Sequence, residues 1–447
     1  MTTAAGNAAR SPLLHWSPLA VAALAAAGCT GDAGGAPGTA GASAAAESPG
    51  LLPAVELDSP AAPGSGQPFL EPAGDGVWMS WTEPSPAGHR VVVSFHDPQN
   101  GEWGPARTVA EGDAFFVNWA DFPSVRVFGD RLFAHWLWRG GQGTYDYGVR
   151  VAWSDDRGAT WSRALTPHED GTPTEHGFVS FFPRGDEVWA AWLDGREMVE
   201  PFGPMSLRAR MVALATRPGA PPPGGNAHTA TPPGLETIVD PMTCECCQTA
   251  AAVADGVPVL AYRDRAEGEI RDVHVSRLVE GAWTPSQAVH DDGWVFGGCP
   301  VNGPAMAAQG ADVAIAWFTA PDNKPRVNVA FSSDGAANFG PPIRLDPGQA
   351  LGRVDVTLLD DGSALVTWLA EGAGSEQGAA IVSRRVTTDG AMSHPVTMAD
   401  TDAARASGFP RIARLGDDRL MLAWTDPHGE GRVRTATFDL AQWQLPG

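Results

Sequence analysis

Seven short apolar segments that each end in an aromatic residue recur along the chain at nearly constant spacing. The aromatic residues are Trp81, Trp136, Trp192, Tyr262, Trp317, Trp368 and Trp424. Successive members lie 55, 56, 70, 55, 51 and 56 residues apart, and the one long interval contains the Pro- and Gly-rich stretch 217–234. Self-similarity at such a period indicates a supersecondary unit that buries its apolar face only against its neighbours. The repeat therefore predicts one array of seven units.

Each unit has the same internal order. A polar motif and an apolar segment come first, then a Gly/Asp turn, the aromatic-ended segment, an alternating third segment such as 89–96 or 147–154, and a weaker fourth. Four short antiparallel strands repeated at about 50 residues are typical of propeller blades. No segment has a sustained helical period. We therefore expect an all-β fold, a β-propeller of seven four-stranded blades, with six blades as the alternative count.

The last unit ends one strand short. Its third strand falls near 435–440, and residues 52–57 precede the first unit. If 52–57 pairs with the last unit, an N-terminal strand closes the ring and removes two exposed sheet edges at once. The alternative is that 52–57 is only the end of the N-terminal tether.

The first fifty residues differ in composition from the repeats. Arg10 lies in a short polar stretch, residues 19–27 are apolar, and Gly28-Cys29 follows. This resembles a bacterial lipoprotein signal, which implies cleavage before Cys29 and acylation of its thiol, while an ordinary signal peptide is the alternative. Residues 30–50 are nearly all Gly, Ala, Ser and Pro, a composition typical of flexible tethers. We expect a signal peptide at 1–28, a tether at 29–50 and a single propeller domain at 51–447.

The N-terminal signal and the net charge limit where the protein is located and what it binds. An exported protein that faces the periplasm or the cell exterior, held at a membrane only by a lipid on Cys29, fits this N-terminus. The formal net charge is −22. An acidic chain without basic clusters argues against nucleic acid and against anionic membrane surfaces as partners. We expect a monomer that binds a glycan or a small acidic ligand.

Two segments, 154–161 (SDDRGATW) and 332–339 (SSDGAANF), resemble the Asp-box of sialidase-like and other BNR-repeat propellers. The first matches the S-x-D-x-G-x-T-W pattern fully and the second is degenerate. In that family the box is a structural turn away from the active site, with Asp and Ser side chains that satisfy turn amides. The resemblance implies a propeller and, by family, a glycoside hydrolase that acts on an acidic glycan. An Arg-Ile-Pro segment, which sialidases carry in the first blade, does not occur here.

In six consecutive units, the loop that enters the first strand carries polar residues or residue types that are rare in turns, such as His, Cys, Trp and Arg. Further charged residues directly follow the aromatic residue that ends the recurring segment, which we call the aromatic landmark. In a propeller these positions meet at one end of the central axis. The arginines among them suit the carboxylate, sulfate or phosphate groups of a ligand. Solvated turns and surface ion pairs are the alternative interpretation. The ligand-binding candidates are Asn118, Trp119, Asp194, Arg196, Gln248, Arg263, Arg265, Asn302, Arg353, Asp355, Arg405 and Arg411.

Glycoside hydrolysis needs a general acid and a nucleophile or base, about 5 to 9 Å apart, on opposite sides of a sugar. Carboxylates from different blades that converge on the axis are suitable, and a nearby histidine is suited to a base or a proton shuttle. Tyr262 takes the place of tryptophan in the fourth unit and resembles the tyrosine of a sialidase site, although a core aromatic is the alternative. The catalytic candidates are Asp121, Glu175, His176, Glu245 and Tyr262.

Four cysteines besides Cys29 remain, namely Cys244, Cys246, Cys247 and Cys299. An even number in an exported protein favours disulfides, one of which ties this segment to Cys299 in the next unit. Strand alternation places Cys247 on the face opposite Cys244 and Cys246, which argues against one zinc ion. The alternative is a soft metal such as copper, held by two cysteines with His176 nearby. No cofactor is required by the glycosidase hypothesis.

Three functions therefore compete on the sequence. One is an exported sialidase-like glycoside hydrolase, the second a non-catalytic propeller that binds a ligand or a protein, and the third a Cys/His metal-binding protein. Fold analogy alone does not separate them, because propellers host many functions.

Overall fold

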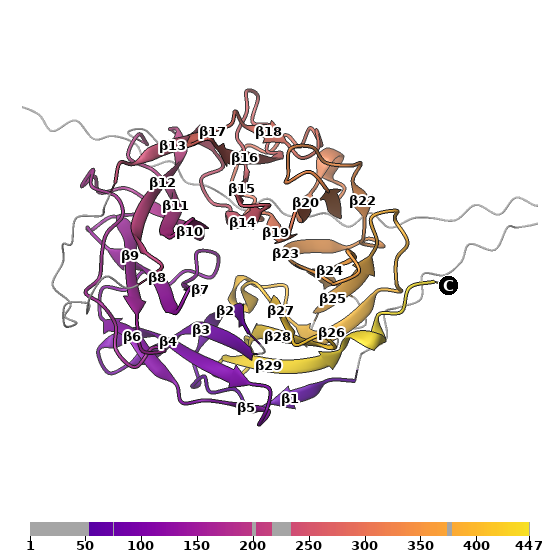
Figure 1. Ribbon diagram of the computed structural model, residues 1–447, viewed down its shortest axis with the longest axis horizontal. Coiled ribbons are helices and arrows are strands. Elements are labelled where there is room, and N and C mark those ends of the chain that lie inside the picture. Colours follow the sequence, from indigo (N-terminus) through magenta and orange to yellow (C-terminus); the bar gives the residue numbers. More distant parts are fainter. Residues whose placement is uncertain (1–52, 75, 199–202, 217–233, 373–377, 447) are drawn as a thin grey trace, which may run out of the picture. The chain divides into compact units, whose positions relative to one another are not determined.

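The computed structural model describes residues 53–446 except 75, 199–202, 217–233 and 373–377. Across these residues, seven β-sheets are arranged around a central axis as the blades of a propeller (Figure 1). The only helical elements among them are three single-turn 3₁₀ segments, η1 (Pro321–Asn323), η2 (Arg405–Ser407) and η3 (Leu440–Gln442). Within the described residues no helix is long and apolar enough to cross a membrane. The expected all-β propeller of seven blades is confirmed.

The first three blades follow the chain from its described N-terminal end. Blade 1 contains β2 (Gly66–Ala73), β3 (Gly76–Ser85), β4 (Gly88–Asp97), β5 (Glu102–Trp103) and β6 (Arg107–Gly112), and both β5 and β6 pair with β4. Blade 2 contains β7 (Ser124–Phe128), β8 (Arg131–Arg139) and β9 (Tyr147–Ser154), and its fourth position is reduced to a bridge between Val151 and Leu165. Blade 3 contains β10 (His176–Arg184), β11 (Glu187–Asp194), β12 (Met205–Leu214) and β13 (Thr237–Thr243).

The remaining blades repeat the same antiparallel order. Blade 4 contains β14 (Ala250–Ala254), β15 (Val257–Arg263), β16 (Val273–Val279), β17 (Ala282–Trp283) and β18 (Gln287–Ala288). Blade 5 contains β19 (Ala305–Gln309), β20 (Asp312–Thr319), β21 (Arg326–Ser332) and β22 (Ile343–Arg344). Blade 6 contains β23 (Ala350–Leu358), β24 (Ala364–Glu371), β25 (Ala379–Val386) and β26 (Val396–Thr401). Blade 7 contains β27 (Arg411–Leu415), β28 (Arg419–Asp426), β29 (Arg432–Asp439) and β1 (Val55–Leu57).

The ring closes through β1, the strand from the opposite end of the chain. Val55 pairs with Thr437 and Leu57 with Thr435 of β29, in antiparallel register. The Arg432 side chain adds hydrogen bonds to the carbonyl oxygens of Ser59, at 2.5 Å, and of Ala61, at 2.8 Å. Closure by an N-terminal strand is therefore confirmed, and the outer edge of β29 is covered.

The aromatic landmarks form the repeated core of the blades. All seven are at most 5% exposed, and they pack between adjacent sheets with the apolar side chains of the neighbouring strands. Two landmark indoles donate to a carboxylate two residues later, Trp81 to Glu83 at 2.6 Å and Trp192 to Asp194 at 2.7 Å. Residues i and i+2 of a strand share a face, so this pairing satisfies a buried N–H locally.

The turn after β9 has the side-chain hydrogen bonds that its sequence predicts. Ser154 Oγ accepts from the backbone N–H of Gly158 at 2.8 Å, and Asp156 Oδ1 accepts from that of Thr160 at 2.8 Å. Trp161 packs against the outer core of the blade. The turn at 332–339 repeats the first two bonds with Ser332 and Asp334. Both segments stabilise blade edges and take no part in the sites described below.

Candidate functional site

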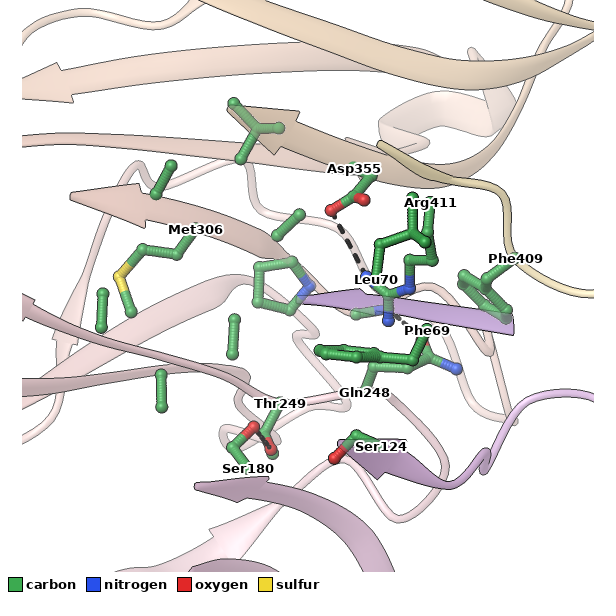
Figure 2. Close-up of a pocket in the computed structure, with 18 of the residues that line it drawn as sticks. Phe69, Leu70, Ser124, Ser180, Gln248, Thr249, Met306, Asp355, Phe409 and Arg411 are labelled. Carbon is green, nitrogen blue, oxygen red and sulfur yellow. Dashed lines mark hydrogen bonds and ion pairs between the residues drawn. The ribbon is translucent and has the colours of Figure 1, made fainter. Parts of the chain in front are cut away.

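Two cavities lie in succession along the propeller axis. We call the first the mouth pocket. It has a volume of about 580 Å³ and is lined by Asn118, Trp119, Ala120, Tyr145, Asp146, Pro173, Thr174, Glu175, Phe178, Met198, Glu245, Cys246, Cys299, Val301 and Arg405. We call the second the axial cavity, of about 380 Å³, lined chiefly by the innermost strands β2, β7, β10, β14, β19, β23 and β27 (Figure 2). Ala120 and Phe178 line both cavities and mark the boundary between them.

The mouth pocket is built from loops at one end of blades 2 to 5 and from η2 of blade 7. Most of these loops lead into the innermost strands, which is where the sequence placed its candidate residues. Trp119 forms an aromatic wall, and the guanidinium groups of Arg353 and Arg405 lie 4.8 and 5.9 Å from its ring centroid. Asn118 accepts from the N–H of Ala120 at 2.9 Å and fixes the turn that presents this indole. Asn118, Trp119 and Arg405 therefore meet in one pocket, as predicted.

Glu175 lies in the wall of the mouth pocket and is joined to a buried carboxyl through a tyrosine. The Tyr147 hydroxyl forms a very short hydrogen bond with the Glu175 carboxyl and lies 3.2 Å from Asp121 Oδ2. Burial raises the pKa of Glu175 to about 7; the Tyr147 hydrogen bond opposes the shift and Glu245 adds to it. A carboxyl with this pKa carries a proton that it can donate near neutral pH.

Asp121 lies below the pocket. It is 3% exposed and accepts from the backbone N–H of Phe178 at 2.8 Å. Burial raises the pKas of both Asp121 and Tyr147 well above their ordinary values. Asp121 therefore lines the axial cavity rather than the mouth pocket, to which Tyr147 connects it, and its catalytic role stays a prediction.

Glu245, a second carboxylate of the mouth pocket, has a dedicated cationic partner. Arg271 Nη1 lies 2.6 Å from Glu245 Oε2, and the side chains are 1% and 6% exposed. Glu269 contacts the same guanidinium at 2.7 Å. A positive charge at hydrogen-bonding distance favours the ionised form of a carboxylate. The pocket thus combines a carboxyl group whose pKa is raised to about 7 with a carboxyl group that is paired with an arginine.

His176 belongs to a buried ion-pair network behind the pocket. Its Nε2 lies 3.2 Å from Asp170 and 3.6 Å from Asp194, and its ring stacks on His168 with the centroids 3.9 Å apart. Burial lowers the pKa of His176, but the two carboxylates outweigh that effect and the pKa is raised. Arg196 pairs with Asp194 at 2.6 Å. His176, Asp194 and Arg196 do not line the mouth pocket, and their roles in catalysis and ligand binding stay a prediction.

Most of the remaining candidate residues near the axis form hydrogen bonds that join one blade to the next. In several blades an inner side chain accepts the backbone N–H of an inner strand in the following blade. The donors and their acceptors, with the backbone N–H donor named first, are Val127 and Glu71, Phe178 and Asp121, Gly303 and Gln248, Arg353 and Asn302, Ile412 and Asp355, and Gln67 and Thr425, at 2.7 to 3.2 Å. Gln248 also donates to the Ala120 carbonyl at 2.6 Å. Gln248, Asn302 and Asp355 therefore join neighbouring blades, and Gln248 and Asp355 also line the axial cavity, so their ligand contacts stay a prediction.

Three of these donors have an unusual backbone. Gln67, Phe178 and Arg353 have φ of 57°, 53° and 55°, and each lies at a register shift near the start of an innermost strand. A positive φ in a non-glycine residue costs free energy and persists where the surroundings enforce it. Here the bulge turns the N–H toward the preceding blade. The strain recurs at equivalent positions and forms part of the joint between blades.

The other predicted arginines and Tyr262 have structural partners. Arg263 is 1% exposed and donates to the carbonyl oxygens of Asn302 and Phe318. Arg353 donates to those of Ala404 and Gly408. Backbone carbonyl groups are satisfied in this way where loops cross the rim.

Arg265 and Arg411 form ion pairs with Glu269, at 2.8 Å, and Asp355, at 3.3 Å. Tyr262 is 1% exposed and hydrogen-bonded to Asp240 and Ser276, which is the environment that the core alternative expected. None of these residues lines the mouth pocket.

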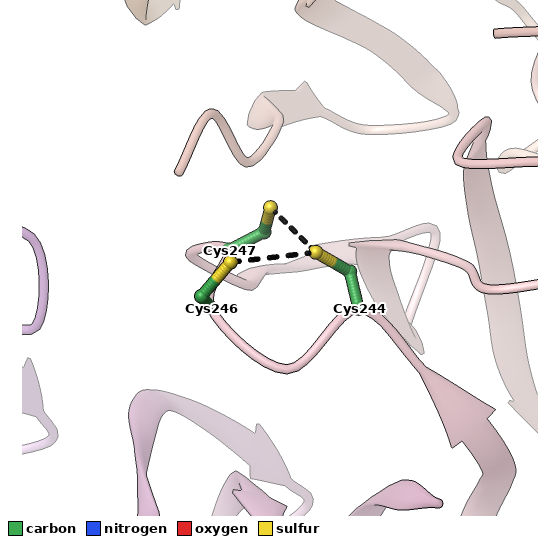
Figure 3. Close-up of side chains that lie close together, drawn as sticks. All are labelled: Cys244, Cys246 and Cys247. Carbon is green, nitrogen blue, oxygen red and sulfur yellow. Dashed lines mark hydrogen bonds between the residues drawn. The ribbon is translucent and has the colours of Figure 1, made fainter. Parts of the chain in front are cut away.

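The cysteines occupy a turn rather than a strand. β13 ends at Thr243, and the turn that follows brings Cys244 Sγ within 2.9 Å of Cys247 Sγ and 3.9 Å of Cys246 Sγ (Figure 3). The prediction that the three sulfurs cannot converge is wrong, because it assumed strand alternation. All four cysteines, Cys299 included, are free thiols, so the two expected disulfides are not present in this structure. His176 is not part of the cluster.

The surroundings of these thiols raise the pKas of some and lower the pKas of others. Burial raises the pKa of Cys244 to about 12. Burial has the same effect on Cys247, but hydrogen bonds from Cys244 and Cys246 together with the charge of Arg263 lower its pKa overall. The Cys246 thiol also contacts Cys299 and lowers the pKa of that residue.

Sequence reasoning did not pair Glu175 with Tyr147 or Glu245 with Arg271. Tyr147 had a signal, since two of the three tyrosines of the chain lie within two residues of each other at 145 and 147, both next to the mouth. Arg271 lies 26 residues from Glu245, and its role follows only from the fold of blade 4.

Comparisons with known proteins concern the fold. No protein-family model matches the chain, and no curated protein matches it. Three solved structures are similar over most of their length. A protein of unknown function from Dyadobacter fermentans is 11% identical, with 86% of this chain and 97% of that chain covered and a TM-score of 0.46.

The GH93 alpha-L-arabinofuranosidase of Fusarium graminearum is 10% identical, with 88% and 99% covered and a TM-score of 0.47. The NanB sialidase of Streptococcus pneumoniae is 9% identical, with 88% and 95% covered and a TM-score of 0.43. Identities at this level do not transfer an activity. The propeller architecture that the Asp-box resemblance implied is confirmed by the seven blades themselves.

Proposed function

We propose that the protein is a glycoside hydrolase that acts in the mouth pocket, with Glu175 as the proton donor and Glu245 as its ionised partner. One observation supports this most strongly. Two carboxyl groups line the same pocket in opposite electrostatic surroundings, since burial raises the pKa of Glu175 to about 7 while Arg271 faces Glu245 at 2.6 Å. Carboxyl groups whose environments separate their protonation states are the usual acid and base pair of such enzymes.

The chemistry uses only side chains of this chain. Glu175 transfers its proton to the leaving glycosidic oxygen as the C–O bond breaks, and Glu245 stabilises the positive charge that develops on the sugar or activates the incoming water. Water then supplies the hydroxyl group of one product, and Glu175 regains its proton. Tyr147 fixes the orientation of the Glu175 carboxyl through its hydrogen bond, so that the proton points into the pocket.

The pocket walls indicate the substrate class. Trp119 and Tyr145 offer aromatic surface, and such rings pack on the apolar faces of sugars. Arg405 lies at the same wall and supplies a cation at the rim. An arginine fork pairs well with a carboxylate or sulfate group. We therefore infer an acidic glycan as the substrate.

Hydrolysis of a panel of fluorogenic glycosides with neutral, uronic and sialic acid sugars tests this function. We expect turnover of an acidic member, reduced by about 10² to 10⁴ in Glu175→Gln. Glu267→Gln, an exposed glutamate in blade 4, is the matched control and keeps full activity. Saturable sugar binding without turnover by the unaltered chain would contradict catalysis and support the non-catalytic binding propeller.

Two further functional statements rest on the sequence. We propose that the chain is exported and anchored through Cys29, which lies outside the described residues, and metabolic labelling with a fatty acid that is lost in Cys29→Ser tests this. The thiols beside Glu245 favour soft-metal binding as a second function of the pocket rim.

A further inference from the structure

The cysteine turn after β13 brings three sulfur atoms together without any other donor type. Cys244, Cys246 and Cys247 each offer one Sγ, and the three atoms lie within 4.8 Å of one another (Figure 3). The separations from Cys244 are 2.9 Å to Cys247 and 3.9 Å to Cys246. Sulfurs of thiolates that share one metal ion lie at separations of this order, since each bond to a soft metal is about 2.3 Å long.

The cluster is closed on one side and open on the other. Cys244 and Cys247 are each 1% exposed, whereas Cys246 is half-buried and lines the mouth pocket. Cys299 reaches the same pocket from the loop before β19, is exposed, and contacts the Cys246 thiol. A buried pair of sulfurs with one partner at a solvent-filled pocket provides both a binding site and a path by which an ion enters.

The surroundings offset the charge of thiolates. Arg263 lies within electrostatic range of Cys247, and Arg271 lies within range of Cys244. Arg263 is itself held rigidly by the carbonyl oxygens of Asn302 and Phe318. Fixed guanidinium groups beside a sulfur cluster reduce the cost of burying an anionic metal–thiolate unit.

We propose that Cys244, Cys246 and Cys247 bind one Cu(I) ion at the rim of the mouth pocket, with Cys299 as an exchangeable fourth sulfur. The absence of imidazole and carboxylate from the three-sulfur group selects a soft ion. Zinc favours four ligands in a closed tetrahedron, which only the exposed Cys299 is placed to complete. The site stands apart from the proposed hydrolysis, because it uses neither Glu175 nor Tyr147.

The test is an anaerobic Cu(I) titration of the reduced full chain against a chromogenic Cu(I) chelator. A Cys29→Ser background leaves only the four cysteines of the propeller. We expect one Cu(I) per chain to be withheld from the chelator, and the affinity to fall by more than about 100-fold in Cys247→Ser and Cys244→Ser. X-ray absorption of the loaded protein is expected to show a first shell of sulfur alone.

Cys299→Ser is the control that keeps the proposal falsifiable if a buried variant fails to fold. Because Cys299 is exposed, this variant is expected to fold, to keep one Cu(I) and to release it to the chelator about 10-fold more readily. Glu175→Gln is expected to bind Cu(I) as the unaltered chain does, so that loss of hydrolysis and loss of metal are separable.

Three outcomes would overturn the proposal. One is a reduced protein that leaves all Cu(I) with the chelator. A second is equal affinity in folded Cys247→Ser. The third is a parallel Zn²⁺ titration in which the chain holds zinc in preference to Cu(I), with Cys299 required.

Discussion

The axial cavity and the mouth pocket lie next to each other on the same axis, yet they use their polar side chains differently. Around the axial cavity, Gln248 and Asp355 accept backbone N–H groups of the following blade, and Arg411 is paired with Asp355. In the mouth pocket, the Glu175 carboxyl and the Cys246 thiol line the open space. One region holds the blades together, and the other keeps reactive groups at a solvent-filled surface.

This difference shows that convergence on a propeller axis does not by itself indicate function. A polar residue near the axis is either a joint between blades or part of a site, and the two are distinguished by what its hydrogen-bonding atoms contact. The substitutions that follow are expected to change stability in one region and chemistry in the other.

The largest expected effect is loss of stability on substitution of Asp355. Asp355→Leu leaves Arg411 buried without its carboxylate and removes the acceptor of the Ile412 N–H, so unfolding becomes easier by about 3 kcal/mol. The measurement is denaturant unfolding followed by tryptophan fluorescence. Asp360→Leu is the control, because it breaks an exposed pair with Arg414 between the same two blades and is expected to leave stability almost unchanged. Equal effects of the two substitutions would break the comparison.

Gln248→Leu is expected to cost about 2 kcal/mol, because it leaves the Ala120 carbonyl and the Gly303 N–H without their partner. Asn118→Ala in the mouth pocket removes one bond within its own turn and is expected to cost less than about 1 kcal/mol. Thermal unfolding of the two variants side by side gives the result. A larger loss of stability in Asn118→Ala would mean that the mouth pocket contributes more to stability than the axial cavity does.

Glu175→Gln is expected to change how stability depends on pH. The folded-state pKa of about 7 lies above the ordinary 4.5, so the native chain binds more protons than the unfolded chain between these values and loses stability as the pH rises through them. Glutamine cannot ionise. The variant should therefore gain about 3 kcal/mol relative to the unaltered chain between pH 4.5 and 8. Thermal unfolding at both pH values measures this gain, and a pH-independent difference would contradict the assignment.

Tyr147→Phe has the smallest expected effect. Its hydroxyl group lowers the pKa of Glu175, so removal of the hydroxyl moves the alkaline limb of the pH–rate profile to higher pH. The side chain stays stacked on Phe116 at 3.9 Å, and stability changes little. A shift of the limb to lower pH would show that Tyr147 does not stabilise the Glu175 carboxylate.

Much of the fold could be predicted because it depends on local pattern. The landmarks Trp81 and Trp317 mark strands whose period and turns are written in the nearby sequence, and both are fully buried. Closure by β1 followed from counting the strands of the last unit. The loops of the mouth were also located, because their position relative to each landmark is constant.

The roles of the site residues depend on contacts between blades, which local pattern does not contain. Asp121 and Glu175 look alike in sequence, but the N–H of Phe178 engages only the first. Arg271 and Glu245 meet through the fold of blade 4. The cysteine turn was misread because a strand was assumed to continue past Thr243.

The central claim is that the mouth pocket holds a carboxyl group that is protonated near neutral pH, and the titration of Glu175 itself tests this without knowledge of the substrate. Carbon-13 resonances of the glutamate side chains are followed from pH 4 to 9, and the Glu175→Gln variant identifies the signal. We expect a midpoint of about 7. A midpoint near the ordinary 4.5 would show that Glu175 is an anion in the resting pocket and would contradict its role as the proton donor.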